Sequence, residues 1–365
     1  MRNYRSETYS KARSQGRKLM RNRVKICISA FFYYSGLVKL LRWWIQRSGR
    51  YLIILYYHRA DGGNLRSQWL YLRRHYRILP LEAALEELYT PNKKRSQRKD
   101  RRTLLALTFD DGYYDNYTHA FALASDLQVP ITIFLIPGYI DCHTSFWWAD
   151  RLICLAQVDQ VSFEEHTYHL DRREESKALA QIIDDRVCNT ASVTDREKLL
   201  IAICDVLAVP SSTISQEEPA PLLTWAQVQE MEKSGWVSFG AHTVHHPDLE
   251  CLTNPVEVKR EVGECRKMLE QKLEHAVDLF AYPYGRIGDY GLCAVKQSGY
   301  KWAVTILPGF NTHRSDPHLL HRMNADADRH LSVVAAETAG VWNFFTRIKR
   351  IVGFSFAFCI AHALC

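Results

Sequence analysis

The chain has 365 residues, of which 47% are hydrophobic, 12% aromatic and 24% charged. Such a composition supports a large buried core and excludes a chain that is disordered over most of its length. The formal net charge is +7, but the excess of Lys and Arg is concentrated in two segments, 2–25 and 93–102, outside the chemical motifs. We therefore expect no nucleic-acid partner; these segments are either solvated or contact an acidic partner such as anionic lipid.

Ten cysteines are scattered singly between Cys27 and Cys365, with no CxxC pair. This spacing indicates neither a zinc ribbon nor a disulfide framework. We therefore expect mostly free thiols, as in a reducing compartment or on a surface that faces the cytoplasm.

The first 50 residues form a basic and amphipathic segment. Its apolar run, 26–38, follows basic residues as the core of a signal peptide would, but no small-residue cleavage site comes after it, and it is short for a membrane span. Residues 39–44 extend it as a basic, aromatic face that suits an interfacial helix, and the apolar tail 351–365 has the same character. Peripheral membrane contact and packing onto the domain both fit, so we expect a location that is either cytoplasmic or peripheral to the membrane.

Short apolar runs bounded by polar turn residues predict the strands. Helices are predicted from amphipathic periodicity and from N-terminal signals: Thr224 and Gln227 form a capping box, and Asn254 precedes Pro255 at a first helical position. The expected strands are 51–57, 104–109, 131–136, 237–240, 277–281 and 302–306, and the expected helices are 67–76, 80–89, 117–127 and those that begin after Thr224 and Asn254.

A charged, periodic stretch without strand runs, 164–207, predicts a helical insertion over about 160–215. Elsewhere strands alternate with helices, which favours the α/β class with a parallel sheet or barrel and catalytic groups at the carboxyl ends of the strands. We expect a catalytic domain over 51–330, with its core over 104–324, and a C-terminal helical apolar tail over 331–365.

Two adjacent carboxylates, Asp110 and Asp111, stand on the turn after the predicted strand 104–109. At such a position one acid can bind a metal while the other takes a proton from a water molecule. An Asp-Asp-Gly turn is also ordinary turn chemistry, so this motif alone does not define a site.

Two histidines four residues apart, His242 and His246, follow the predicted strand 237–240. From one helical turn or tight loop they can reach the same metal ion, and imidazole suits zinc and its neighbours. Thr243 follows His242, so the pattern is not the HExxH motif of zincins. His245 is expected to point away as a spare polar residue.

Three motifs occur in the order TFDDG (108–112), HTVHHP (242–247) and FAYPYG (280–285). In this order they resemble the polysaccharide deacetylases of the NodB type, carbohydrate esterase family four, over about 104–324. The resemblance implies a deformed (β/α) barrel, a divalent metal ion, with zinc expected first, and hydrolysis of the N-acetyl groups of a glycan to acetate and free amine.

The resemblance also implies a role for each motif residue. Asp110 would be the general base, and the backbone N–H of Tyr284 would help to stabilise the oxyanion. The metal would be held by Asp111, His242 and His246.

The sequence departs from the family pattern at one place and matches it weakly at another. Phe280 stands where many members have an Arg three residues before the motif-three proline, so another cation must orient Asp110; Arg322 is preferred, and Arg286 is the alternative. The general acid of the family is usually a histidine in a Leu-x-His context, which His321 matches, although a surface histidine is the alternative interpretation.

Pro283, Trp147 and Trp148 are the expected substrate-binding residues. Pro283 would fix the turn of the third motif, and the two tryptophans would line a groove, because aromatic faces pack on the apolar faces of pyranose rings. Core packing of the tryptophans is the alternative.

Together these features predict a metal-dependent hydrolase that removes N-acetyl groups from N-acetylhexosamine residues of a bacterial-type polysaccharide. Two alternatives remain: a hydrolase of a small cyclic amide on the same scaffold, which the missing motif-three Arg leaves open, and a non-catalytic glycan-binding protein. The intact pair of carboxylates argues against the last. The oligomeric state does not follow from the sequence.

Overall fold

The computed structural model describes residues 23–90, 100, 102–140, 149–164, 166–209 and 222–342. Trp147 and Trp148 lie outside these ranges, as do the first 22 residues and most of the C-terminal tail. The seven cysteines within the described ranges are free thiols, as the sequence predicts.

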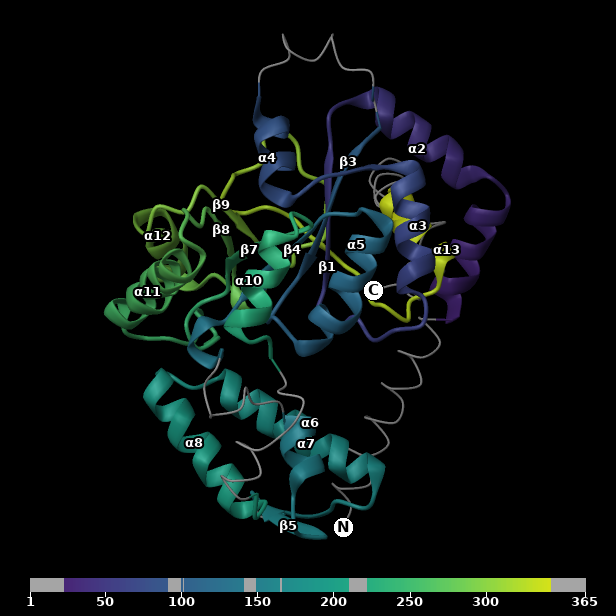
Figure 1. Ribbon diagram of the computed structural model, residues 1–365. Coiled ribbons are helices and arrows are strands. Elements are labelled where there is room, and N and C mark those ends of the chain that lie inside the picture. Colours follow the sequence, from purple (N-terminus) through teal and green to yellow (C-terminus); the bar gives the residue numbers. More distant parts are fainter. Residues whose placement is uncertain are drawn as a thin grey trace, which may run out of the picture.

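The centre of the fold is one curled sheet in which every strand pair runs parallel (Figure 1). The order is β10-β1-β3-β4-β7-β8-β9, with the short strand β2 beside the start of β3. The strands are β1 (Leu52–Tyr57), β2 (Arg77–Ile78), β3 (Leu104–Phe109), β4 (Ile131–Leu135), β7 (Val237–Ala241), β8 (Leu279–Ala281), β9 (Trp302–Val304) and β10 (Met323–Asn324). All six predicted strands are present, and β2 and β10 are additional.

Helices alternate with the strands, as predicted. The capping box is formed, because the Gln227 N–H donates to Thr224 Oγ1 at 3.3 Å and the Thr224 N–H donates to Gln227 Oε1 at 3.0 Å. Asn254 caps the helix that begins at Pro255. The helices are α3 (Leu65–His75), α4 (Leu81–Tyr89), the π-helical turn η2 (Asn116–Phe121) continued by α5 (Ala122–Leu127), α10 (Trp225–Lys233), α11 (Pro255–Leu273), α12 (Gly288–Gln297) and α13 (Leu331–Thr338).

Alternate residues of the strands pack into two separate apolar layers. On β1, Ile53 and Leu55 belong to the layer under the outer helices, whereas Leu52 and Ile54 belong to the layer inside the curl. The inner layer also contains the buried face of α4, which lies at the amino ends of the strands (Figure 1). Because both faces of the sheet are covered, its strands are continuous apolar runs rather than alternating ones.

The segment 317–324 lies between β9 and β1 and closes the curled sheet. At its start, Ala303 of β9 donates its N–H to the Pro317 carbonyl at 2.8 Å. At its end it becomes β10, which runs parallel to β1 with Met323 beside Leu55. The sheet is thereby completed as a barrel, and this segment is its seam.

Residues 149–209 form a separate layer at the carboxyl edge of the barrel, with an apolar core of their own (Figure 1). The layer contains α6 (Ala149–Leu155), the hairpin of β5 (Gln160–Phe163) and β6 (His166–His169), α7 (Arg173–Cys188) and α8 (Val193–Val206). Helices make up most of this layer, and the hairpin of β5 and β6 is an element that the sequence pattern did not indicate. Strand β6 has no apolar run, since only Tyr168 of its four residues is buried, and periodicity therefore does not reveal it.

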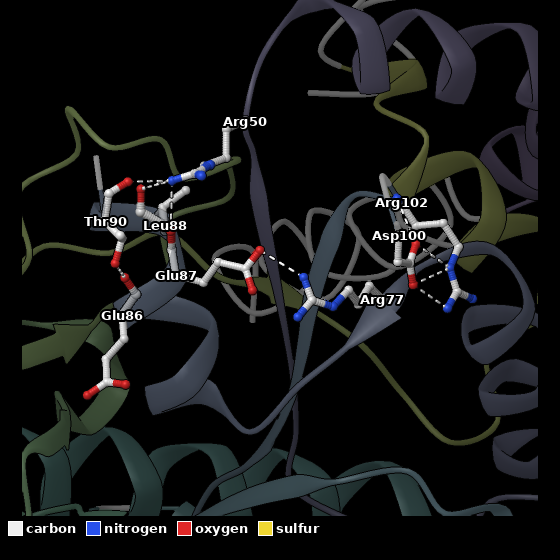
Figure 2. Close-up of polar contacts among 8 residues, drawn as sticks. All are labelled: Arg50, Arg77, Glu86, Glu87, Leu88, Thr90, Asp100 and Arg102. Atoms are coloured by element: carbon white, nitrogen blue, oxygen red, sulfur yellow. Dashed lines mark hydrogen bonds and ion pairs between the residues drawn. The ribbon is translucent and has the colours of Figure 1, made fainter. Parts of the chain in front are cut away.

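At the amino edge of the sheet, arginine side chains connect neighbouring segments through partly exposed contacts (Figure 2). Arg50 donates to three carbonyls at the end of α4, which have no partner within the helix. Two ion pairs lie in the same region. The contacts are Arg50 with the carbonyls of Glu87, Leu88 and Thr90, Arg77 with Glu87, and Arg102 with Asp100.

The helix Arg23–Tyr34 and α2 (Leu37–Ser48) lie along one side of the barrel, beside α3 and α13 (Figure 1). Among the described residues, no single helix has both the length and the apolarity that a membrane span requires. These two helices meet that test only when taken together, and they are bent by 78° relative to each other.

Candidate active site

The sequence motifs meet at the carboxyl edge of the sheet. Asp110 and Asp111 follow β3, and His242 and His246 follow β7, with β4 between these two strands. The loop after β7 begins in register with β4, because the His242 N–H donates to the Leu135 carbonyl at 2.9 Å. The parallel arrangement therefore brings the two motifs to the same end of the barrel, as predicted for catalytic groups.

Asp111, His242 and His246 form a buried cluster suited to a metal ion. One ligand atom from each residue lies within 4.8 Å of the other two. Asp111 Oδ1 is 3.5 Å from Nε2 of each histidine, and all three side chains are buried. Neither carboxylate oxygen of Asp111 has a hydrogen bond of ordinary length and angle among the described residues. A buried carboxylate in that state is costly unless a cation balances it, so the cluster fits a divalent ion.

The surrounding backbone fixes the orientation of the histidines. His242 Nδ1 lies 2.8 Å from the Ala281 carbonyl, and a carbonyl only accepts, so Nδ1 carries the proton and Nε2 is left as the ligand atom. Within the loop, Thr243 Oγ1 accepts the His246 N–H at 2.9 Å. Both contacts present the imidazoles to Asp111.

His245 is not the spare polar residue that was expected. Its Nδ1 lies 2.7 Å from Glu261 Oε1, and its backbone N–H donates to Glu261 Oε2 at 2.9 Å. Glu261 is a buried carboxylate of α11. His245, one of the three residues between the two candidate ligands, therefore anchors their loop to a helix.

Backbone strain is concentrated in this region. Among the described residues, eight non-glycine residues have positive φ, and four of them belong to the site. Such left-handed conformations persist where surrounding contacts over-determine the backbone, and they cluster at functional sites. The four residues are Asp111 (φ 73°), Thr243 (φ 64°), His246 (φ 56°) and Tyr284 (φ 55°).

Asp110 forms a bidentate pair with Arg322. The two terminal nitrogens of the guanidinium donate to Oδ1 at 2.7 Å and to Oδ2 at 2.8 Å, and both side chains are buried. Arg322 Nε also donates to the Thr305 carbonyl at 2.9 Å, which fixes the plane of the guanidinium. The pair therefore has the parallel two-bond geometry that is strongest for Arg and carboxylate.

Arg322, rather than Arg286, is thus the cation that contacts Asp110. Phe280 is fully buried, and its ring packs against Tyr282 and Tyr300 at centroid distances of 5.2 and 5.1 Å. Arg286, the alternative cation, instead pairs with Asp248 at 2.8 Å.

The two carboxylates have opposite electrostatic surroundings. Burial raises the pKa of Asp110, but the Arg322 guanidinium, together with smaller contributions from His242 and His58, holds that pKa below its ordinary value. Burial raises the pKa of Asp111, which lacks such a partner. Burial also lowers the pKa of His246 well below its ordinary value, which favours the neutral imidazole that a metal ligand must be.

The third motif forms a tight turn beside the histidines. Its 3-10 turn η4 (Pro283–Gly285) begins with Pro283, and the Gly285 N–H donates to the Tyr282 carbonyl at 2.9 Å. The Tyr284 ring packs edge-on against His246 at a centroid distance of 4.7 Å. The Tyr284 backbone is thereby held at the rim of the cluster.

The other predicted residues are less closely tied to the cluster. His321 precedes Arg322 on the seam, and its Nδ1 lies 3.3 Å from the Leu307 carbonyl. Trp147 and Trp148 lie outside the described residues, so their place in a groove stays a prediction.

The sequence analysis assigned no role to two residues of the site. His58 follows β1, which pairs with β3 up to Tyr57 and Phe109, and its charge influences the pKa of Asp110, Asp111 and His246. Arg196 of α8 reaches from the insertion to the histidine loop, donates to the His245 carbonyl at 2.5 Å and contacts the Tyr139 hydroxyl. The register of β1 and β3 could have indicated His58; no local pattern marks Arg196.

A parallel α/β barrel with paired acids and two histidines at its carboxyl edge defines a hydrolase-type site. The model of the polysaccharide deacetylase family matches residues 97–197 and 206–303, more than half of the chain. The protein therefore belongs to the polysaccharide deacetylase family, and it is an enzyme of the N-deacetylase class, which hydrolyses carbon–nitrogen bonds other than peptide bonds.

Individual relatives agree with this assignment. "Putative polysaccharide deacetylase YxkH" of Bacillus subtilis (strain 168) is 22% identical over 291 residues, which cover 77% of this chain and 74% of the relative. IcaB from Ammonifex degensii superposes with a TM-score of 0.52 at 18% identity, covering 80% of this chain and 98% of IcaB. Streptococcus pyogenes deacetylase PplD, solved in complex with acetate, superposes with a TM-score of 0.50 at 19% identity, covering 78% of this chain and 97% of PplD. The structural likenesses confirm the deformed (β/α) barrel fold.

Proposed function

We propose that the protein is a metal-dependent enzyme that removes N-acetyl groups from N-acetylhexosamine residues of a glycan. The observation that carries the proposal is the placement of the Asp111, His242 and His246 cluster next to the Asp110–Arg322 pair at the carboxyl edge. One group is suited to hold a cation, and the other is a carboxylate kept ionised beside it.

A divalent ion fits the three ligand atoms, because they are buried, converge on one point and include a carboxylate with no hydrogen bond of ordinary geometry among the described residues. Zinc is the first expectation, and nickel and cobalt accept similar ligands. When bound there, the ion would act as a Lewis acid toward the acetyl carbonyl oxygen.

Asp110 is the proposed general base. Arg322 holds both of its oxygens in one plane and lowers its pKa, so the carboxylate is ionised and fixed before the substrate arrives. As water adds to the acetyl carbonyl carbon, Asp110 takes one proton from that water.

The proposed oxyanion donor is the backbone N–H of Tyr284. The left-handed conformation of Tyr284 and the packing of its ring on His246 fix this peptide before reaction, which is what a preorganised donor requires. Pro283 begins the turn and restricts its backbone. Trp147 and Trp148 remain proposed contacts of the sugar rings.

The carbon–nitrogen bond breaks when the leaving nitrogen gains a proton, which gives acetate and the free amine. His321 is the proposed general acid, because Leu319-Leu320-His321 matches the Leu-x-His context of the family. His58 is the competing candidate, because it follows β1 at the carboxyl edge, where Tyr57 lies beside Phe109 and hence next to the two carboxylates. Separate His321→Ala and His58→Ala variants distinguish them, since only the loss of the general acid is expected to lower turnover by at least about 100-fold.

The absence of the motif-three Arg was the reason to consider a cyclic-amide hydrolase. Arg322 weakens that reason, because it supplies a guanidinium to Asp110. The binding-protein alternative is disfavoured by a carboxylate that is buried, paired and ionised beside the candidate metal ligands.

The test is acetate release from N-acetylglucosamine oligomers by wild-type protein, by Asp110→Asn and by chelator-treated protein before and after zinc or cobalt is added back. We expect release by the wild type, a loss of at least about 100-fold in Asp110→Asn, and recovery of the chelated protein with metal. Absence of release by metal-loaded wild-type protein would reject this substrate class, and unchanged release after chelation would reject the metal.

A further inference from the structure

The two N-terminal helices carry an unusual share of the exposed apolar surface. Thirteen large hydrophobic side chains are exposed among the described residues, and six of them fall within residues 26–44. Their exposed fractions range from 43% for Ile26 to 76% for Tyr34. Such a concentration marks an interaction surface rather than scattered surface residues.

These exposed side chains follow helical spacing. In α2, Trp43 and Trp44 lie three and four residues after Leu40, and in the preceding helix Tyr34 lies three residues after Phe31. We call these five residues the N-terminal apolar face. The spacing places them on one stripe of each helix.

The opposite side of each helix is already packed against the barrel. In the first helix, Lys25 pairs with Glu337 of α13 at 2.6 Å, and the Tyr33 ring packs on Tyr71 of α3 at a centroid distance of 6.0 Å. Val38 of α2 contacts Ala335 and Ala339 at α13. Arg42 donates to the Tyr71 hydroxyl of α3 at 3.0 Å. Because these contacts occupy the inner side, the apolar face does not result from helices that have failed to dock.

The charge of this region has a single sign. Residues 8–60 contain no Asp or Glu, and the two helices themselves contain five basic residues. A second copy of the same surface would bring these like charges together, whereas anionic lipid headgroups complement them. The basic residues of the two helices are Arg23, Lys25, Lys39, Arg42 and Arg47.

We propose that the N-terminal apolar face binds the surface of an anionic lipid bilayer. Trp43, Trp44 and the neighbouring apolar side chains enter the interface, and the exposed basic residues Arg23, Lys39 and Arg47 contact the headgroups. The helix pair is docked on the barrel by its inner side, so the bilayer would be held against one flank of the enzyme (Figure 1). The proposal does not depend on the deacetylase reaction, because binding is measured without turnover.

The test is co-sedimentation of the full chain with vesicles of phosphatidylcholine alone or mixed with phosphatidylglycerol. We expect binding to the mixed vesicles that weakens in 0.5 M salt, and a loss of at least about tenfold in the Trp43→Ser/Trp44→Ser variant. Lys39→Glu/Arg47→Glu is expected to reduce binding to the mixed vesicles by a similar factor.

The matched control is Ile201→Ser/Val206→Ser, which removes two exposed apolar side chains from α8, away from the N-terminal helices. We expect its binding to stay within about twofold of wild type, and thermal unfolding to be similar for all variants. Wild-type protein that fails to sediment with the mixed vesicles overturns the proposal. Equal vesicle binding by Trp43→Ser/Trp44→Ser would also overturn it. So would a wild-type protein that does not bind vesicles but is a dimer, if the same variant is a monomer, because the face would then be a dimer interface.

Discussion

The two edges of the barrel use the same chemical pair in opposite environments. At the carboxyl edge, Arg322 and Asp110 are 2.7 Å apart with side chains 0% and 3% exposed. At the amino edge, Arg102 and Asp100 are 2.8 Å apart, but their side chains are 41% and 38% exposed (Figure 2). The distances are the same within a tenth of an ångström, so access of water is the main difference between the pairs.

This difference decides what each pair can do. Water and salt screen the amino-edge pair, which therefore contributes little to stability and mainly restrains a surface segment. The carboxyl-edge pair is desolvated, so removing either partner leaves a buried charge without compensation. A chain that needs a fixed, ionised carboxylate has to build it inside.

The largest expected effect is the loss of one partner of the buried pair. Arg322→Met should lower the free energy of unfolding by about 3 to 5 kcal/mol, because Asp110 is left buried and unpaired. In the double variant Asp110→Asn/Arg322→Met part of that stability should return, while acetate release stays lost. Urea unfolding of the three proteins measures this. An Arg322→Met variant within about 1 kcal/mol of wild type would show that the pair is not desolvated in solution.

The second effect compares neighbouring histidines. His246→Ala should weaken zinc binding by more than about 100-fold, because it removes a proposed ligand, whereas His245→Ala removes only the contact with Glu261 and should weaken it less. Competition with a chromogenic chelator gives both affinities. Equal losses in the two variants would mean that the ligand assignment is incorrect.

The third effect concerns the contact between the insertion and the histidine loop. Arg196→Met leaves the His245 carbonyl and the Tyr139 hydroxyl without a charged donor, so we expect a loss of about 1 to 3 kcal/mol in stability. Zinc affinity should fall as well, because the loop that carries His246 is loosened. Arg173→Met, at the exposed start of α7, is a control expected to change neither quantity. Wild-type stability and zinc affinity in Arg196→Met would show that this contact does not hold the loop.

The smallest effect is at the amino edge. The hydrogen bonds from Arg102 hold the pKa of Asp100 below its ordinary value of 3.8, so the pair stabilises the fold above that pH and the contribution disappears as the pH falls through the lowered pKa. Arg102→Gln should return the Asp100 pKa toward 3.8 and change stability by less than about 1 kcal/mol. Titration followed by NMR measures the pKa. A larger change in stability would remove the contrast between the edges.

Local signals allowed much of the barrel to be predicted. The apolar run at β3 matches the strand Leu104–Phe109 residue for residue, and the caps at Thr224 and Asn254 begin helices where expected. Strands β2 and β10 have two residues each, and they are strands only because a partner lies beside them. Their existence depends on contacts that are distant in sequence, which periodicity does not reveal.

In the candidate site, too, residues in local motifs could be predicted, whereas contacts between distant segments could not. The motifs that hold Asp111, His242 and His246 are short stretches of sequence, so their residues could be named in advance. The contact between His245 and Glu261 joins a loop to the next helix, and Arg196 comes from a separate layer. Arg322 was preferred over Arg286 only by its place in a family-like segment, whereas the barrel seam determines its actual contact.

The seam also gives the protein an order of assembly. Asp110 and Arg322 are separated by 212 positions in the sequence, and the segment that carries Arg322 must lie between β9 and β1 before the two can meet. A chain still emerging from the ribosome can complete β1, β3 and both candidate metal-binding motifs while Asp110 has no guanidinium beside it. Formation of the Asp110–Arg322 pair is thereby tied to closure of the barrel, so an unfinished chain does not contain the proposed base in its paired form.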